Sequence, residues 1–369
     1  MPPRPALLID ELVEEVLFRL PPAEPAWLVR ASAVCKSWRC IFADPGFRRR
    51  YREFHGTPPI LGFFDHNTFV PTSAILPAKP KRTWAPRSVP RTLDCRHGRA
   101  LFTTLGKAPK TFDFTVLDPL TSYYSNVPFR VDTRFSFSAG VLCATQGCNH
   151  HDCKRGHFLV AVVATNQEQC LTSGWLYSSE TRVWSELTTL HHPGVKCKSH
   201  FAQSSVLIGD ALYFNTDGII QCQLGTLRLS MFQKPIDCDG RLMKAEDGGL
   251  AFATVVNDTD LILWSTDTGH NGAVGWAKLR VIHLKTLLPD GALSIITLKC
   301  GISLQPRASV SGIAEGTQTI FVSGYFGSYM VDLKSGGARQ MCDRDEKILL
   351  PYMAFYIPAI EAASTSHGQ

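Results

Sequence analysis

The chain has 369 residues, of which 44% are hydrophobic and 19% are charged. This is the composition of a folded globular protein, and it excludes a disordered or collagen-like chain. Lysine and arginine number 38 against 32 aspartates and glutamates, a formal net charge of +6. Such a small excess does not by itself indicate nucleic-acid binding. At roughly 100–200 residues per domain, the length allows one to three domains.

No apolar run approaches the roughly 18–20 residues of a membrane-spanning helix, and the longest is Phe158–Ala164. Acidic residues from Asp10 to Glu15 lie where a secretion signal would need an uncharged stretch. We therefore expect no membrane association and a location in the cytoplasm and/or nucleus. We also expect the twelve cysteines to be reduced thiols.

Helical periodicity is confined to the N-terminal residues. Leu8, Leu12, Val16 and Leu20 repeat every four residues, and Pro21-Pro22 ends that helix. A second apolar stripe runs from Trp27 to Phe42. The turn Asp44-Pro45-Gly46 follows it and leads into the basic run Phe47–Arg52. The pattern predicts a small unit of about three helices over residues 5–53, with the basic run solvated.

From about residue 58 the periodicity changes to two, which predicts β-strands over residues 58–360. The expected strands are Ala100–Thr104, Thr111–Leu117, Val141–Thr145, His157–Ala164, Gly174–Tyr177, Ser205–Phe214, Leu250–Val256, Leu261–Ser265, Ile320–Ser323 and Ser328–Leu333. We expect a last strand, Tyr352–Ile357, to pair with Ile60–Phe64. We expect residues 361–369 to form a disordered tail.

A degenerate strand–turn–strand repeat indicates how these strands are organised. It occurs at Phe114–Asn126, Trp175–Leu187 and Tyr329–Met341, with weaker copies at Ile220–Phe232 and Leu261–Leu279. The spacing of about 50 residues is typical of four-stranded propeller blades. We therefore predict an α+β multidomain protein in which a three-helix unit precedes an all-β domain, a β-propeller of roughly six blades. Another large β fold is the alternative.

The helical residues carry a resemblance to a known family. Asp10–Pro21 is similar to the opening of an F-box, Leu-Pro-x-x-Leu-x-x-Glu-Ile-Leu-x-Arg-Leu-Pro, although Leu8-Ile9 stands in place of the first Leu-Pro. Leu28–Arg39 resembles its second half, with Val34-Cys35-Lys36-Ser37-Trp38-Arg39 the most specific stretch. Asp44-Pro45-Gly46-Phe47 matches its end. The junction Phe54–Phe64 adds to these matches. On this basis the chain resembles plant, especially grass-type, F-box proteins with a propeller-like associated domain.

The resemblance implies binding to a Skp-type adaptor, and through it to a cullin, with a target protein held by the β domain for ubiquitination. The implied adaptor-binding residues, shared with the core of the helical unit, are Leu8, Leu12, Val16, Leu17, Leu20, Leu28, Val34, Cys35, Trp38, Ile41 and Phe42. Trp38 is the expected anchor, because Trp is enriched at binding hot spots. The alternatives are a helical cap on a non-ligase propeller that binds a protein or carbohydrate, and a propeller enzyme.

Metal-binding and catalytic chemistry is weakly indicated. Cys143, Cys148, His150, His151, Asp152, Cys153 and His157 are residue types that bind zinc. Their spacing lacks a Cys-x-x-Cys pair, so we expect a polar hairpin loop with incidental thiols, and no metal or cofactor. A nucleophile elbow, a phosphate loop and a zinc-protease motif are absent, so we expect no enzyme. The basic stretch Pro77–Arg91 is expected to be an exposed loop, which makes a nucleic-acid partner improbable.

The target itself leaves no motif in the sequence. Six aromatic residues have the potential to line a binding face: Tyr123, Tyr124, Trp175, Trp184, Trp264 and Trp276. Their strand-like positions favour a place in the cores of the blades.

Overall fold

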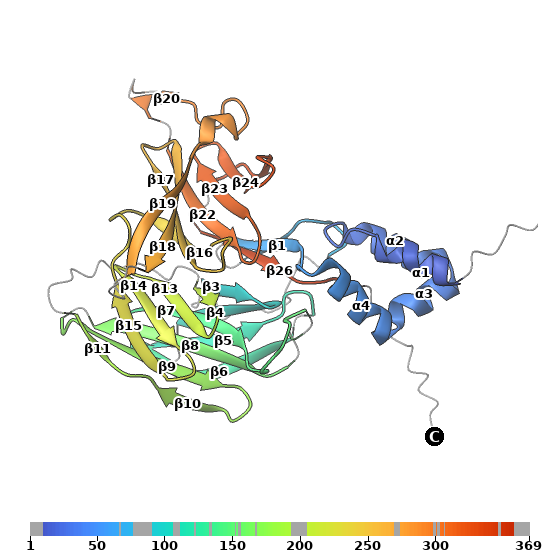
Figure 1. The fold of residues 1–369 in the computed structure, drawn as a ribbon, viewed down its shortest axis with the longest axis horizontal. Helices are drawn as coiled ribbons and strands as arrows, with labels where there is room; N and C mark the ends of the chain where they lie inside the picture. Colours follow the sequence, from blue (N-terminus) through green and yellow to red (C-terminus); the bar gives the residue numbers. More distant parts are fainter. Residues whose placement is uncertain are drawn as a thin grey trace, which may run out of the picture.

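A computed structural model describes residues 10–65, 68–76, 91–105, 111–121, 123–132, 135–151, 153, 156–166, 168–192, 205–268, 274–297, 300, 303–305, 307–345 and 348–357. The described residues form four α-helices followed by six antiparallel sheets arranged in a ring, with a further two-stranded sheet (Figure 1). Within these residues, no helix has the length and apolar character needed to cross a bilayer. The predicted tail at 361–369 and most of the basic stretch Pro77–Arg91 lie outside the described residues.

The helices are α1 (Asp10–Phe18), α2 (Pro25–Val34), α3 (Lys36–Ala43) and α4 (Pro45–His55), and we call them the helical unit. The predicted helical unit is confirmed, with four helices rather than about three, because the basic run forms α4. Asp44 caps this helix by accepting a hydrogen bond from the Phe47 N–H at 2.6 Å. Phe47 and Tyr51 lie one turn apart and are both buried, so the arginines between them face outward.

The six blades are built in chain order. The first complete blade contains β3 (Arg91–Arg96), β4 (Arg99–Leu105), β5 (Thr111–Leu117) and β6 (Tyr124–Asp132). The second contains β7 (Ser136–Cys143), β8 (Phe158–Asn166), β9 (Leu171–Ser178) and β10 (Val183–Glu186), with β11 (Leu190–His191) also paired to β9. The third contains β12 (Val206–Ile208), β13 (Ala211–Asn215), β14 (Ile219–Gln223) and β15 (Arg228–Phe232).

The fourth blade contains β16 (Gly240–Lys244), β17 (Leu250–Val256), β18 (Asp260–Thr268) and β19 (Val274–His283). The short 3₁₀ helix Leu284–Thr286 and the pair β20 (Ile296–Thr297) and β21 (Ser303–Leu304) follow it. The fifth contains β22 (Ala308–Ala314), β23 (Thr319–Gly324), β24 (Gly327–Asp332) and β25 (Ala338–Cys342). The sixth combines β26 (Leu349–Met353), β1 (Ile60–Asp65) and β2 (Thr68–Pro71).

The predicted propeller is confirmed. Each of the five repeat copies is the outer hairpin of a blade, β5–β6, β9–β10, β14–β15, β18–β19 or β24–β25. One strand prediction was wrong: Ser205–Phe214 is two strands, β12 and β13. Gly209 turns the chain between them with a φ of +60°, a conformation that glycine adopts without strain.

The ring is closed by strands from the two ends of the β domain. β26 pairs antiparallel with β1, Ile60 opposite Met353 and Asp65 opposite Leu349. The predicted pairing is therefore confirmed, although the last strand begins at Leu349 rather than Tyr352. Because β1 and β26 are hydrogen-bonded to each other, the edges along which they meet have their backbone groups paired. Residues Ala354–Ile357 then leave the sheet, and Phe355 is buried in the core of the helical unit.

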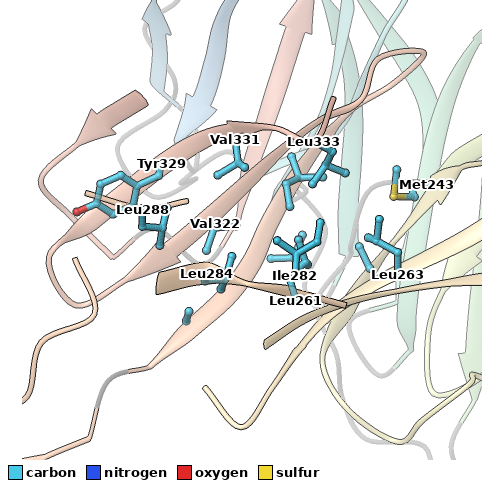
Figure 2. Close-up of a cluster of buried hydrophobic side chains, with 14 of the residues drawn as sticks. Met243, Leu261, Leu263, Ile282, Leu284, Leu288, Val322, Tyr329, Val331 and Leu333 are labelled. Carbon is cyan, nitrogen blue, oxygen red and sulfur yellow. The ribbon is translucent and has the colours of Figure 1, made fainter. Parts of the chain in front are cut away.

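Apolar side chains fill the spaces between adjacent blades. Figure 2 shows the largest of these clusters, in which the fourth and fifth blades face each other. Its labelled members are Met243, Leu261, Leu263, Ile282, Leu284, Leu288, Val322, Tyr329, Val331 and Leu333. Such packing fixes the blades in a ring, and the connecting loops at its two ends become potential binding surfaces.

Candidate functional site

The structure divides the predicted adaptor-binding residues into three groups. Leu17, Leu28 and Phe42 are buried in the core of the helical unit. Leu20, Trp38 and Ile41 are half-buried against that core. Leu12, Val16, Val34 and Cys35 are exposed. Leu8 lies outside the described residues.

The exposed group forms apolar surface on the helical unit. Leu12 and Val16 lie one turn apart on α1 and are 53% and 54% exposed, and Val34 at the end of α2 is 63% exposed. Large apolar side chains exposed together on one small unit are a feature of interaction surfaces. Trp38, the expected anchor, is half-buried, because it packs against the buried cluster of the helical unit.

Sequence reasoning left Trp27 out of the adaptor-binding set, although it belongs to the apolar stripe of α2. Its side chain is 52% exposed, and the guanidinium of Arg30 lies 5.7 Å from the ring centroid. Pro25, Leu28 and Ala31 face the core, and Trp27, about 100° around the helix from Leu28, lies at the edge of that face. The phase of the helix therefore did not show that Trp27 is more than half exposed. Its exposure makes Trp27 a better candidate for an exposed anchor than Trp38.

The position of the helical unit leaves this apolar surface accessible. The four helices project from the rim of the ring beside β1 and β26 (Figure 1). Among the described residues, the β domain contributes Phe355 and Ile357 to the helical core. The rings of Phe355 and Tyr51 meet edge to face, with centroids 6.4 Å apart. The unit is thus attached at α4, the last of its helices.

A cavity of about 390 Å³ lies at the axis of the ring, which we call the axial cavity. The ends of the innermost strands line it, together with the Gly56–Pro58 linker. Among its polar side chains, Asp94 and Arg96 come from β3, and Glu315 comes from the turn between β22 and β23. A concave site with a few convergent polar groups is a common place for a ligand.

Arg96 is the centre of a buried network in this cavity. Its guanidinium donates to Glu315 at 2.6 Å, to Asp94 at 3.1 Å and to the Ser205 carbonyl at 2.6 Å. Burial opposes the charged guanidinium, but the carboxylates of Asp94 and Glu315 outweigh it and raise the pKa of Arg96 above its ordinary value. The network joins several blades across the axis. The Glu315 side chain remains 32% exposed to the cavity.

The aromatic residues considered for a binding face fall into two sets. Trp175 and Trp184 pack against the buried cluster between the first two complete blades, and Trp264 and Trp276 pack against another. These four belong to the blade cores, which is the interpretation that their positions favoured. Tyr123 and Tyr124, at the β5–β6 hairpin, are 64% and 49% exposed.

The candidate zinc ligands also divide. Cys143, Cys148, His150 and Cys153 converge, with their ligand atoms all within 4.8 Å of one another. His151 points elsewhere, since its ring contacts Phe355 with the centroids 5.8 Å apart. His157 is not part of the group, and Asp152 lies outside the described residues. The expectation of an incidental set of thiols did not anticipate this convergence, because it depends on how the loop folds back.

Comparison with known proteins identifies the helical unit. Residues 7–50 match the F-box domain. The protein therefore contains an F-box domain followed by a six-bladed β-propeller. No curated protein matches the chain.

Solved structures resemble the chain only distantly. One is a protein from Lactobacillus plantarum, at 12% identity and a TM-score of 0.38, covering 66% of this chain and 68% of that one. An α-L-arabinanase from Penicillium chrysogenum has 12% identity and a TM-score of 0.37, covering 78% and 88%. The β-propeller domain of a protease from Pyrococcus furiosus has 9% identity and a TM-score of 0.37, covering 71% and 72%. At these values the similarities carry no information about activity.

Proposed function

We propose that this protein is the substrate-recognition subunit of a Skp–cullin–F-box ubiquitin ligase, of the plant, grass-type kind that its sequence resembles. The F-box would bind a Skp-type adaptor and thereby a cullin, in the cytoplasm or nucleus. The observation that carries the proposal is the exposed apolar surface of Leu12, Val16 and Val34 on a domain that matches the F-box.

The energetics of this surface favour a bound partner. Covering a Leu or Val side chain contributes roughly 1.5–3 kcal/mol before the costs of association. These side chains are only 52–63% exposed, so three of them together with Trp27 supply part of the favourable free energy of binding and the rest of the interface must supply the remainder. Attachment through α4 leaves α1 and α2 on the part of the unit that projects from the ring (Figure 1).

In this proposal the propeller binds the target protein and performs no bond chemistry of its own. Bringing a target to a bound ubiquitin-conjugating enzyme raises their effective concentration. The axial cavity, with Glu315 partly exposed, and the loops at the ends of the ring are the candidate recognition surfaces.

The rival function is a non-ligase propeller whose helices act as a cap. A cap would bury its apolar residues against the ring. The helical unit instead lies beside the rim, and Leu12, Val16 and Trp27 are more than half exposed (Figure 1). This arrangement favours the ligase subunit over the cap.

The test is retention of a purified Skp-type adaptor by the full chain and by a Leu12→Asp, Val16→Asp variant. Both positions are exposed, so the variant should keep its fold, whereas changes at half-buried Leu20 or Trp38 would disturb the core as well. A Val183→Asp, Leu279→Asp variant is the matched control, because these residues are 58% and 59% exposed on blade strands.

We expect the wild type and the control to retain the adaptor. The Leu12, Val16 variant should lose at least about tenfold in affinity, equivalent to about 1.4 kcal/mol. Equal retention by all three proteins would show that the α1 surface is not the adaptor site. No retention by the folded wild type would contradict the proposed function itself.

A further inference from the structure

The described residues between β7 and β8, which we call the cysteine loop (144–151, 153, 156 and 157), place Cys148, His150 and Cys153 beside the end of β7. Cys143 is the last residue of that strand, and Cys148, His150 and Cys153 come from the loop itself. Cys153 is buried and the other three are partly buried. Three sulfur atoms and one imidazole nitrogen therefore share one small, partly buried volume.

The spacing of these atoms agrees with tetrahedral coordination of zinc. A Zn–S bond of about 2.3 Å places two thiolate sulfurs about 3.8 Å apart at the corners of a tetrahedron. The Nδ1 atom of His150 lies 3.8 Å from the Sγ of Cys153, and no pair of ligand atoms exceeds 4.8 Å. No pair of ligand atoms is therefore more than about 1 Å farther apart than two thiolate sulfurs of a tetrahedral zinc site. We propose that Cys143, Cys148, His150 and Cys153 bind a structural Zn²⁺ ion.

Groups around the four residues support ligation in the way that outer-shell groups do in metal sites. The backbone N–H of Thr145 is 3.4 Å from the Cys143 sulfur, and that of His150 is 3.3 Å from the Cys148 sulfur. The His97 ring stacks on His150 at 3.9 Å with an interplanar angle of 11°. These contacts stabilise the thiolates and fix the orientation of the imidazole.

A buried cation provides charge balance. Three thiolates and a neutral imidazole around Zn²⁺ give the site a net charge of −1, which is costly to bury alone. Arg99 is 2% exposed, and its Nη1 atom lies 3.9 Å from the Cys153 sulfur. Its Nη2 atom donates to the Cys153 carbonyl and, at 2.8 Å, to the Gly156 carbonyl. The Arg99 guanidinium thus balances the negative charge of the site and holds the loop in place.

The site lies next to the attachment of the helical unit. His151, beside the ligand His150, contacts Phe355, and Phe355 contacts Tyr51 of α4. A metal that fixes the cysteine loop would therefore stiffen the junction between the F-box and the propeller. Any effect of this stiffer junction on the orientation of a bound target rests on the proposed function. The metal site itself does not depend on that function.

The experiment is metal analysis of the full-length chain, purified without chelator, beside Cys148→Ser and Cys153→Ser variants. Cys170→Ser is the matched control, since Cys170 is also half-buried but is not part of the cluster. We expect one zinc per chain in the wild type and control, and a loss of at least tenfold in bound zinc in each cluster variant. Replacement of zinc by Co²⁺ should give the absorption bands of tetrahedral thiolate ligation.

The wild type alone can overturn the proposal, so a variant that fails to fold does not weaken the test. One result would contradict the proposed zinc site: the folded wild-type chain takes up no zinc or cobalt, and its cluster thiols react freely with a thiol reagent. A disulfide within the cluster in protein purified under reducing conditions would also contradict it. Zinc content that is equal in the wild type and the folded cluster variants would place the metal elsewhere and overturn the assignment.

Discussion

Tyr51 shows how one buried side chain joins the helices of the F-box. Its hydroxyl donates to the Leu20 carbonyl at 2.7 Å, and its ring stacks on Phe47 and meets Phe355 edge to face. The hydrogen bond ties α4 to the segment that follows α1. Burial raises the pKa of the Tyr51 phenol well above its ordinary value, because the phenolate would lose its hydration.

This arrangement predicts a pH-dependent contribution to stability. A Tyr51→Phe variant should lose about 0.5–1.5 kcal/mol of unfolding free energy at neutral pH through loss of the hydrogen bond. Because the folded pKa is raised, the contribution of Tyr51 is complete below the unfolded pKa of about 10 and is lost as pH rises above it. Urea unfolding followed by circular dichroism at several pH values should show the wild type and variant converging in alkali. A constant difference up to high pH would contradict this account.

At the scale of elements, β22 and β26 approach each other closely through a glycine. A Cβ atom on Gly312 would lie 2.1 Å from the Leu349 carbonyl oxygen, a backbone atom that cannot move aside. Gly312 follows an irregularity in the β22–β23 register between Val310 and Gly312. The glycine therefore permits the packing of the fifth blade on the blade that closes the ring.

A Gly312→Ala change should force these strands apart. We expect a loss of about 1–3 kcal/mol or more of unfolding free energy, the cost of overpacking. Gly275→Ala is the control, because its added Cβ would meet only the Asp267 carbonyl oxygen at an ordinary 3.5 Å. Chemical denaturation of both variants tests this. Equal stability would mean that β22 and β26 are not packed so closely.

Elements also show where sequence reasoning succeeds and fails. The outer hairpins of the blades were predicted because alternating apolar residues flank polar turns. The innermost strands β3, β16 and β22 were missed. Strand β3, for example, carries Arg96, which is buried because it pairs with Glu315 of the β22–β23 turn and with the Ser205 carbonyl. Period-two patterning does not identify such strands, since the pairing partners are distant in sequence.

The same limit applies to the candidate sites. The apolar positions of the F-box were visible as stripes, but which of them face outward depends on packing among the helices. Leu17 and Leu28 are buried in the core, whereas Trp27 lies at the surface. The four residues of the cysteine loop were visible as a composition bias. Their convergence required the backbone of the loop, which has His150 in the left-handed region at a φ of +60°, a conformation that sequence alone does not specify.

At the scale of the whole molecule, the F-box and propeller are joined through Phe355. This residue is 5% exposed and belongs to the helical core, although it follows directly on the closing strand β26. The end of the β domain thus anchors the unit formed at the start of the chain. The orientation of the F-box relative to the ring depends on this contact.

A Phe355→Ala change should loosen the junction and the helical core while the propeller stays folded. Deleting the ring removes interactions of about 3–5 kcal/mol in a well-packed site. We expect a broad-specificity protease to cut the linker Gly56–Pro58 at least tenfold faster, with the thermal stability of the propeller nearly unchanged. Phe326→Ala, at a 40% exposed position, is the control. An unchanged cleavage rate would show that Phe355 does not hold the junction.

The central claim is that the F-box of this protein binds a Skp-type adaptor. Calorimetric titration of purified adaptor into the folded full-length chain measures this directly. We predict saturable binding of one adaptor per chain, and a heat-capacity change that is negative because apolar surface is buried. A folded chain that gives no saturable binding would contradict the claim, and the exposed apolar residues of α1 and α2 would then require a different partner.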